Sequence, residues 1–355
     1  MMLEGIKVID FTQYLPGPFA TLRLGDLGAE VIKIERPEGD PARQLSGGKV
    51  FQANNRNKQS VALNIKDPSD RETAKRMIQQ ADVVIESFRP GVLESLGLGY
   101  EEIQKLHPGI VYCSLTGYGQ TGALSKLGSH DINYMALSGL LSQMKDENNR
   151  PVHPSLTFAD LIGGMAASEA ILAALVKKAK TGTGSYIDLA ITDAAISLLT
   201  THLQYPEGRG VKGLEGGTIS YRLYETKDGR FMSLGALEPK FWQNFCQAAG
   251  HEEWGRWHLE RAIPGNEAFE AVTQLFLSRT FAEWMEFSER VDCCLAPVLE
   301  TYEVESSTYN QSRGLITQSP WNDMQVQTTA RPRAMNPPPK LNEHHDLHTP
   351  LPNQP

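Results

Sequence analysis

The sequence of 355 residues is long enough for about two domains and a large buried core. Hydrophobic residues make up 40% of it and charged residues 21%, a composition typical of soluble globular proteins. The formal net charge of −8 leaves no basic excess to neutralise a phosphate backbone, so we expect no nucleic-acid partner.

The cysteines and the first residues indicate the compartment. None of the 4 cysteines forms a C-x-x-C pair, and the adjacent Cys293 and Cys294 are poorly placed for a mutual disulfide. The residues from Met1 onward contain neither the basic segment nor the apolar core of a signal peptide. The longest apolar helical stretch, residues 170–176, is too short to cross a bilayer. We therefore expect a cytoplasmic protein without a membrane partner.

In the first half of the chain, short apolar runs alternate with helical patterns. The runs predict strands at residues 6–11, 30–34, 61–65, 82–88 and 110–115. Helices are predicted at residues 18–28, with Pro18 in the first turn, and from an N-cap at Asp67 to about Gln80. This β-α-β order predicts an α/β fold in which helices cover a parallel sheet.

The second half begins with an Ala- and Leu-rich stretch that predicts a long buried helix at residues 160–180, followed by a strand at 185–190. Around residues 205–220 the sequence becomes Gly-rich and polar, which marks the crossing into a second region. That region is predicted to contain a hairpin, followed by amphipathic helices to about residue 290. Its strands are residues 219–226 and 230–234, joined by a turn at 227–229. From residue 331 the chain is rich in Pro, Asn and His and is predicted to be irregular.

His130 and Asp160 are the candidate catalytic residues. An ordinary His titrates at roughly pH 6.5, so His130 suits a base at neutral pH, although a lone His is more often a satisfied polar residue. Asp131, at the start of a predicted helix, is a candidate cap whose N–H points outward as an oxyanion donor. Asp160 lies on an apolar helix, where a carboxylate is costly unless paired or functional, so helix cap and catalyst are equally good interpretations. A His and an Asp on opposite sides of one carbon could invert a stereocentre next to a carbonyl.

Three further polar residues end predicted strands. Glu238 precedes a predicted helix and is either a first-turn carboxylate or the orienting partner of an imidazole. Arg36 and Arg89 are candidate phosphate ligands, because open α/β sheets bind ligands at the carboxyl ends of strands, although solvated loop arginines are commoner. Residues 117–122 match G-x-G-x-x-G, but no helical pattern begins there, so a nicotinamide site is not expected. No Cys/His cluster has metal-ligand spacing.

A series of short motifs resembles, in order, those of the family III CoA-transferase superfamily. They are PGPF at 16–19, GDLGA at 25–29, ERP at 35–37, RPG at 89–91, GLG at 97–99, GYGQTG at 117–122 and KDGR at 227–230. The resemblance implies a Rossmann-like large domain at residues 1–205, a smaller α+β domain at 206–305, and a C-terminal segment at 306–355 that returns to the large domain. It also implies an interlocked homodimer of ring-shaped chains.

Three segments resemble the racemase branch of that superfamily. Residues 130–134 resemble a signature in which the histidine is a catalytic base, and residues 238–241 resemble a segment whose glutamate supports that histidine. Residues 292–299 resemble a third racemase segment. The resemblance implies a CoA thioester substrate and no separate cofactor. The residues expected at the CoA ligand are Arg36, Asn57, Lys58, Arg89, Ser129 and Tyr134.

The sequence therefore supports the hypothesis of a 2-methylacyl-CoA racemase or epimerase. In this hypothesis His130 and Asp160 exchange the α-proton through an enolate, the Asp131 N–H stabilises the enolate, and Glu238 orients His130. The alternative is a CoA-transferase in which Asp160 is a nucleophile. A third class is a CoA-binding protein without catalysis. Ser129 and Ser95 depart from the usual racemase residues and leave the acyl group open.

Overall fold

A six-stranded sheet, in which every strand runs parallel to its neighbours, forms the centre of the first part of the molecule. Its strands are β1 (Lys7–Asp10), β2 (Glu30–Glu35), β3 (Gln59–Ala62), β4 (Val83–Glu86), β5 (Val111–Thr116) and β6 (Ser185–Ala190). The order β3-β2-β1-β4-β5-β6 is that of a Rossmann-type sheet. Because the order reverses between β1 and β4, the carboxyl ends of these two strands mark the expected ligand crevice.

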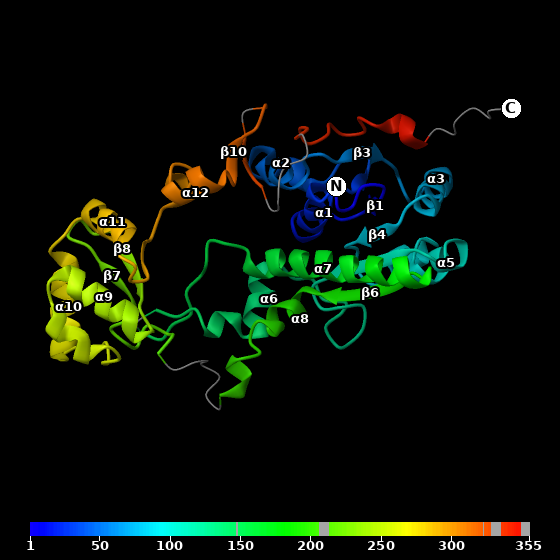
Figure 1. Cartoon of the computed structure of the whole chain (residues 1–355). Coiled ribbons are helices and arrows are strands. Elements are labelled where there is room, and N and C mark those ends of the chain that lie inside the picture. Colours follow the sequence, from blue (N-terminus) through cyan, green and yellow to red (C-terminus); the bar gives the residue numbers. More distant parts are fainter. Residues whose placement is uncertain (147, 206–212, 322, 328–334, 349–355) are drawn as a thin grey trace. The chain divides into compact units, whose positions relative to one another are not determined.

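The computed structural model describes the chain except residues 147, 206–212, 322, 328–334 and 349–355. The chain divides into two compact units, residues 1–199 with 314–355, and residues 200–313 (Figure 1). The α/β prediction, with a Rossmann-like sheet and a smaller α+β part, is confirmed. The homodimer stays a prediction.

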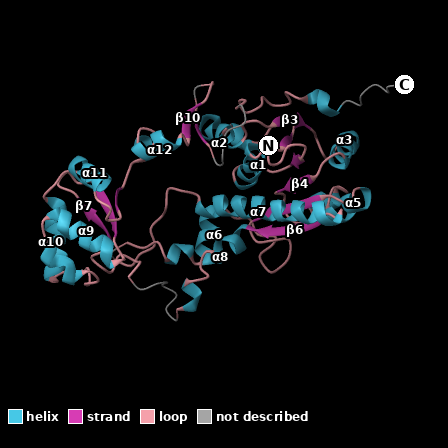
Figure 2. Ribbon diagram, viewed as in Figure 1, coloured by secondary structure: helices cyan, strands magenta, loops and turns pink. Residues whose placement is uncertain are grey.

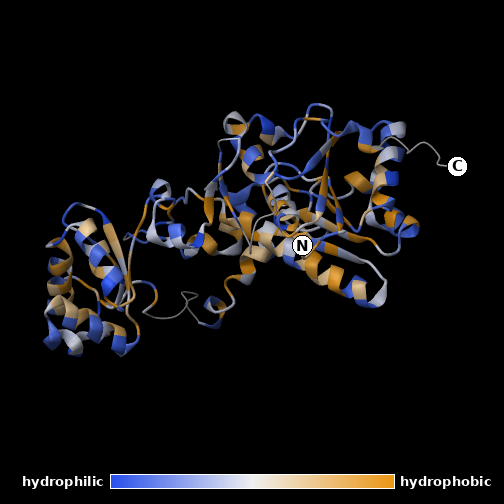
Figure 3. Ribbon diagram, turned by 45° about the horizontal axis from the view of Figure 1, so that its top comes forward, coloured by the Kyte–Doolittle hydropathy of each residue, from blue (hydrophilic) through white to orange (hydrophobic). Residues whose placement is uncertain are grey.

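Helices cover both faces of the large sheet (Figure 2). The helices of this unit are α1 (Pro16–Asp26), α2 (Lys49–Asn54), α3 (Pro68–Gln79), α4 (Val92–Ser95), α5 (Tyr100–Leu106), α6 (Asp131–Ser138), α7 (Phe158–Thr181) and α8 (Ile191–Ser197). Successive strand residues alternate between the faces, so Val8 packs with α1 and α7 whereas Ile9 packs with α3 and α5. Hydrophobic and hydrophilic residues are banded along the helices in Figure 3, as expected of helices buried on one side.

The second unit has a core of its own. Its elements are β7 (Tyr221–Glu225), β8 (Phe231–Gly235), α9 (Pro239–Ala249), α10 (Glu267–Leu277), α11 (Phe281–Arg290), β9 (Leu295–Pro297) and α12 (Thr308–Arg313). The antiparallel sheet β7-β8-β9 packs against stacked aromatic side chains of the helices, including Trp242, Phe276 and Trp284. The predicted hairpin is confirmed, and the turn residues Lys227–Gly229 lie between its two strands.

The C-terminal segment returns to the edge of the large sheet. After the short hairpin of β10 (Ile316–Gln318) and β11 (Met324–Val326), the chain runs beside β3, which is an edge strand. The Ala62 N–H donates to Asn342 Oδ1 (2.9 Å), and the His344 N–H donates to the Ser60 carbonyl (3.0 Å). The segment therefore covers backbone groups that an edge strand would otherwise expose.

Most predicted elements are found, with shifted ends. The strand β6 and the helix α3 with its Asp67 cap match the predictions closely, whereas β3 begins two residues earlier than predicted, at Gln59 instead of Val61. The length of the apolar helical stretch was underestimated at residues 170–176. Within the described residues one helix, α7, is long and apolar enough by length and composition to cross a membrane. In the most apolar 18-residue window of α7, 44% is buried inside the protein. Core helices of soluble proteins can meet the same criteria of length and composition.

Candidate active site

The first turn of α6 presents His130 at the helix cap. His130 has an extended backbone (φ −134°, ψ 174°), its side chain is exposed, and its N–H donates to Asn133 Oδ1 (3.0 Å). Asn133 therefore satisfies a backbone donor that lies outside the helical hydrogen-bond pattern. The prediction that Asp131 caps this helix is wrong, because His130 occupies the cap position and Asp131 is the first helical residue.

The Asp131 carboxylate joins α6 to α7. The Asp160 N–H donates to Asp131 Oδ1 (3.0 Å), and both residues are half-buried. Asp160 is the third residue of α7, where Thr157 holds the cap position, so the cap interpretation of Asp160 is not supported. The first turns of the two helices thus bring His130, Asp131 and Asp160 into one cluster of the first unit.

Asp160 is a carboxyl group suited to carry a proton near neutrality. Burial, and then the negative charge of Asp131, raise the pKa of Asp160 to about 7. The amino end of a helix normally stabilises a carboxylate and lowers its pKa. Here burial and the neighbouring charge outweigh that effect. A group with a pKa close to the working pH is effective both as a base and as an acid.

Tyr134 supports the turn that carries His130. Its side chain is 7% exposed, and its hydroxyl donates to the Ser129 carbonyl (3.0 Å). A Cβ atom at Gly117 would overlap the Tyr134 ring, so the glycine makes room for the tyrosine. Burial raises the pKa of Tyr134, which therefore stays protonated and keeps donating. The structure directs this hydroxyl to the backbone, whereas the sequence suggested a contact with CoA.

Arg36 and Arg89 follow the carboxyl ends of β2 and β4, as predicted. Both are exposed, and Arg36 Nε donates to the Gly39 carbonyl (2.9 Å). The Arg89 guanidinium lies beside Gly128, where an added Cβ would come within 3.1 Å of Nη2. Arg89 therefore stands next to the segment that carries Ser129 and His130. The phosphate-binding roles of both arginines stay predictions.

Lys58 is in the interior and contacts other protein groups, whereas the sequence placed it among the residues expected at the CoA ligand. Its side chain is 1% exposed, and its Nζ donates to the carbonyl of Pro18, to Thr21 Oγ1 and to Asn55 Oδ1 at 2.7–2.9 Å. It also forms a buried ion pair with Asp10 (3.3 Å). Burial lowers the pKa of Lys58 to about 8, although Asp10 opposes the change.

Asn57 is similarly engaged with the protein. Its Oδ1 accepts from the Asn336 N–H (2.6 Å), and its own N–H donates to the Asn336 carbonyl (3.2 Å). Asn57 precedes β3, so it lies at the amino end of that strand, whereas Arg36 and Arg89 lie at carboxyl ends. It lines a polar hollow of about 350 Å³ that the C-terminal segment covers.

Glu238 belongs to the second unit. It holds the cap position of α9, is exposed, and accepts the Phe241 N–H at its backbone carbonyl (3.0 Å). Burial raises the pKa of the Cys294 thiol, and the charge of Glu238 raises it further. The pairing of Glu238 with His130 stays a prediction, since the two residues lie in separately described units.

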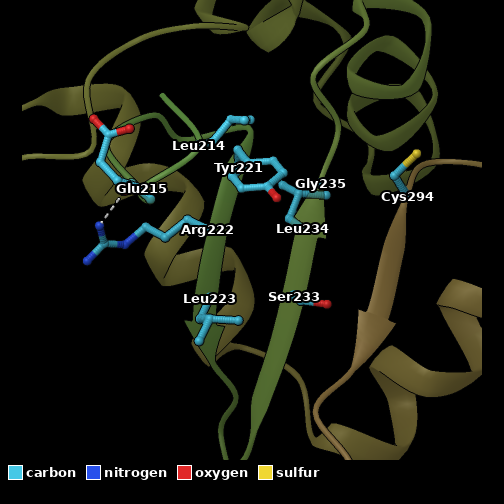
Figure 4. Close-up of a pocket in the computed structure, with 10 residues that line it drawn as sticks. Leu214, Glu215, Tyr221, Arg222, Leu223, Ser233, Leu234, Gly235 and Cys294 are labelled. Carbon is cyan, nitrogen blue, oxygen red and sulfur yellow. Dashed lines mark hydrogen bonds between the residues drawn. The ribbon is translucent and has the colours of Figure 1, made fainter. Parts of the chain in front are cut away.

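The second unit also has a hollow of about 440 Å³ on its sheet (Figure 4). Leucine side chains, Tyr221 and Cys294 line it, and Arg222 is held at its side by the Gly216 carbonyl (2.8 Å). Among the described residues no group of three or more His, Cys, Asp and Glu side chains could hold a metal ion.

Two features of the site were not expected from the sequence. The bond between Asp131 and Asp160 joins residues far apart in the chain, and no local pattern signals it. The glycines after Asp160 did offer a signal. A Cβ at Gly163 would lie 2.8 Å from the Ile191 side chain, and one at Gly164 would lie 2.5 Å from the Pro16 carbonyl. These glycines let α8 and α1 approach the first turns of α7.

A family model described as CoA-transferase family III matches residues 3–345. The chain belongs to this family. Human alpha-methylacyl-CoA racemase is 33% identical to it over 331 residues, which cover 91% of this chain and 85% of the racemase. Human succinyl-CoA:glutarate CoA-transferase is 34% identical over 333 residues, which cover 88% of this chain and 75% of the transferase.

Solved structures agree with this family III assignment. A crystal structure of Rv3272 from Mycobacterium tuberculosis matches with a TM-score of 0.85 and 28% identity over 98% of both chains. A CaiB/BaiF family protein from Brucella suis matches with a TM-score of 0.82 and 27% identity over 97% of both chains. Family III is enzymatic, and the similar identities of its racemase and transferase members leave both reactions as candidates.

Proposed function

We propose that this family III enzyme is a 2-methylacyl-CoA racemase or epimerase. The observation that carries the proposal is the half-buried Asp160, whose pKa of about 7 suits it to take and return a proton at working pH. His130 is exposed at the neighbouring helix cap and supplies the second proton-transfer group. The likeness to alpha-methylacyl-CoA racemase supports the same reaction.

In the proposed reaction one of the two residues removes the α-proton of the thioester. The C–H electron pair moves to the carbonyl and forms an enolate, which the Asp131 N–H stabilises. The other residue donates its proton to the opposite face of the same carbon, which inverts the stereocentre. In one direction Asp160 is the base and protonated His130 the acid, and in the reverse direction the roles exchange. Glu238 orients His130, and Arg36 and Arg89 bind the CoA phosphates.

The second candidate is CoA transfer. It is favoured by the identity of 34% with succinyl-CoA:glutarate CoA-transferase, which is as high as the 33% identity with the racemase or slightly higher. In this reaction the Asp160 carboxylate attacks the thioester carbonyl, forms a mixed anhydride and releases CoA thiolate. The His130 side chain has no proton to transfer at an α-carbon in this reaction.

Isotope exchange separates the two reactions. The enzyme is incubated in deuterated water with single enantiomers of several 2-methylacyl-CoA thioesters, and α-deuterium is measured by mass spectrometry. We expect deuterium incorporation with loss of optical purity. Absence of exchange across the panel, together with a hydroxylamine-trapped acyl group on Asp160, would overturn the racemase proposal in favour of transfer.

We also propose that the enzyme acts as a homodimer in the cytoplasm and uses no cofactor besides the CoA of its substrate. Exchange activity should survive dialysis against a chelator, and light scattering should give twice the chain mass. A metal requirement or a monomer with full activity contradicts this proposal.

A further inference from the structure

The Asp131 side chain has no part in the reaction as proposed above, which uses only its N–H. Yet its Oδ1 accepts the Asp160 N–H at 3.0 Å, from a half-buried position. We propose that the Asp131 carboxylate is a positioning residue that acts through Asp160: its oxygen orients the first turn of α7, and its negative charge disfavours a second negative charge on Asp160. This inference rests on the proposed function, because it concerns Asp160 as a proton-transfer group.

The geometry supports the orienting role. Asp160 lies in the first turn of α7, whose N–H groups have no partner within the helix. The Asp131 oxygen satisfies the N–H of Asp160 itself, so the bond holds the backbone of the residue that carries the proton-transfer side chain. Gly163 and Gly164 let Ile191 and the Pro16 carbonyl pack tightly one turn further along. The first turn of α7 is therefore held on several sides.

The charges around Asp160 support the electrostatic role. The helix α7 packs against α1, α6, α8, β5 and β6. The titratable or charged groups on these elements are Arg23 and Asp26 on α1, His130 at the cap of α6 with Asp131 and Tyr134 inside it, Asp193 on α8, Tyr112 and Cys113 on β5, and Tyr186 and Asp188 on β6. Asp26 is paired with Arg56. Burial has the largest effect on the pKa of Asp160, and the negative charge of Asp131 raises this pKa further. Arg23 is bound to Ser168, two turns away, and therefore does not neutralise the pair.

Two substitutions separate the roles. Asp131→Asn keeps a side-chain oxygen that can accept the Asp160 N–H but removes the charge. Asp131→Ala removes both. Asp193 is exposed and lies in the first turn of α8, so Asp193→Asn removes the same charge from a helix that packs on α7 and serves as the control.

The carboxyl groups are titrated directly by ¹³C NMR of the full chain with labelled aspartate, and the Asp160 signal is assigned with Asp160→Asn. In Asp131→Asn we expect the Asp160 midpoint to move to lower pH by about 1 unit, as when a neighbouring like charge is removed. Asp193→Asn should leave the midpoint unchanged. An unchanged midpoint in Asp131→Asn would overturn the electrostatic role.

Activity is measured as α-deuterium exchange over a range of pH. In the direction that uses Asp160 as the base, the acidic limb of kcat/KM should move down in parallel with the NMR midpoint in Asp131→Asn. Asp131→Ala should lose 10-fold or more in kcat at every pH, with little change in KM. Equal kcat in the Asn and Ala variants would overturn the orienting role. If the wild-type enzyme shows no exchange but the midpoint still moves, the charge effect stands and the proposed function fails.

Discussion

At the scale of residues, His130 and Asp160 lie at the starts of two different helices, which the hydrogen bond between Asp160 and Asp131 joins. Both groups transfer a proton in racemisation, so both are needed. His130→Ala and Asp160→Ala should each lower the rate of α-proton exchange by roughly 10²–10⁴-fold, the usual contribution of a positioned acid or base. Retention of CoA binding by calorimetry is the control for folding. A fully active His130→Ala variant contradicts the racemase proposal.

The raised pKa of Asp160 also predicts a cost in stability. The folded protein holds the Asp160 proton up to about pH 7, whereas the unfolded chain releases it near the ordinary pKa of 3.8. This carboxyl therefore lowers the free energy of unfolding progressively as the pH rises from about 4 to 7. We expect Asp160→Asn to gain stability relative to the wild type at pH 8 and less at pH 5, measured by urea unfolding. An equal difference at both pH values contradicts this prediction.

Lys58 shows how far residue types alone can predict a site. A basic residue beside a strand of an α/β sheet is a reasonable ligand candidate, but the sequence does not show which way its side chain points. The structure encloses it with Asp10. Burial alone would raise the pKa of Asp10, but the charges of Lys33 and Lys58 and the hydrogen bonds from Thr12 and Thr21 together lower it to about 2.

The buried position of Lys58 leads to a test. Lys58→Met leaves Asp10 with one cationic partner fewer and should lower the free energy of unfolding by about 3–5 kcal/mol. Arg89→Ala is exposed and should change it by no more than about 0.5 kcal/mol, while weakening the binding of CoA. Chemical unfolding and calorimetric titration with CoA measure the two effects. Unchanged stability in Lys58→Met would contradict the structural assignment.

At the scale of elements, the packing of α7 against α8 depends on Gly163. An added methyl group would lie 2.8 Å from Ile191 Cγ1, so Gly163→Ala should lower stability by about 1–3 kcal/mol. Ile191→Ala makes room for the methyl group. Gly163→Ala should therefore cost less stability in the Ile191→Ala background than in the wild type. A double-mutant cycle from urea unfolding measures the coupling. Additive effects would show that the two helices are not in contact as described.

The elements themselves were largely predictable, because their signals are local. The short apolar run at β1, the Asp67-Pro68 start of α3 and the turn at Lys227–Gly229 each depend on neighbouring residues. Strand order depends on contacts between distant segments, and the pairing of β1 with both β2 and β4 has no local signal. The same reason hid the bond between Asp131 and Asp160. His130 and Asp160 could be singled out as candidates because their residue types and motifs are themselves the signal, and their catalytic roles stay predictions.

At the scale of the whole molecule, the first unit is completed by residues from the far end of the chain. Deletion of residues 336–355 would remove the partners of Ala62 and Ser60 on β3 and the Pro339 carbonyl that binds Arg43. We expect a lower melting temperature and concentration-dependent self-association, because an uncovered edge strand pairs with other chains. Light scattering and thermal unfolding test both effects. A truncated protein that is as stable and as monodisperse as the full chain contradicts this role.

The return of the chain to β3 also bears on how the protein folds during synthesis. The second unit is contiguous, so it can fold as soon as it leaves the ribosome, whereas the first unit must wait for its closing segment. At roughly 5–20 residues per second, the 137 residues from 199 to 336 take about 7–27 s to synthesise. For that interval the nascent chain carries an exposed β3 edge, and slow translation of the second unit would lengthen the period in which a chaperone has to protect it.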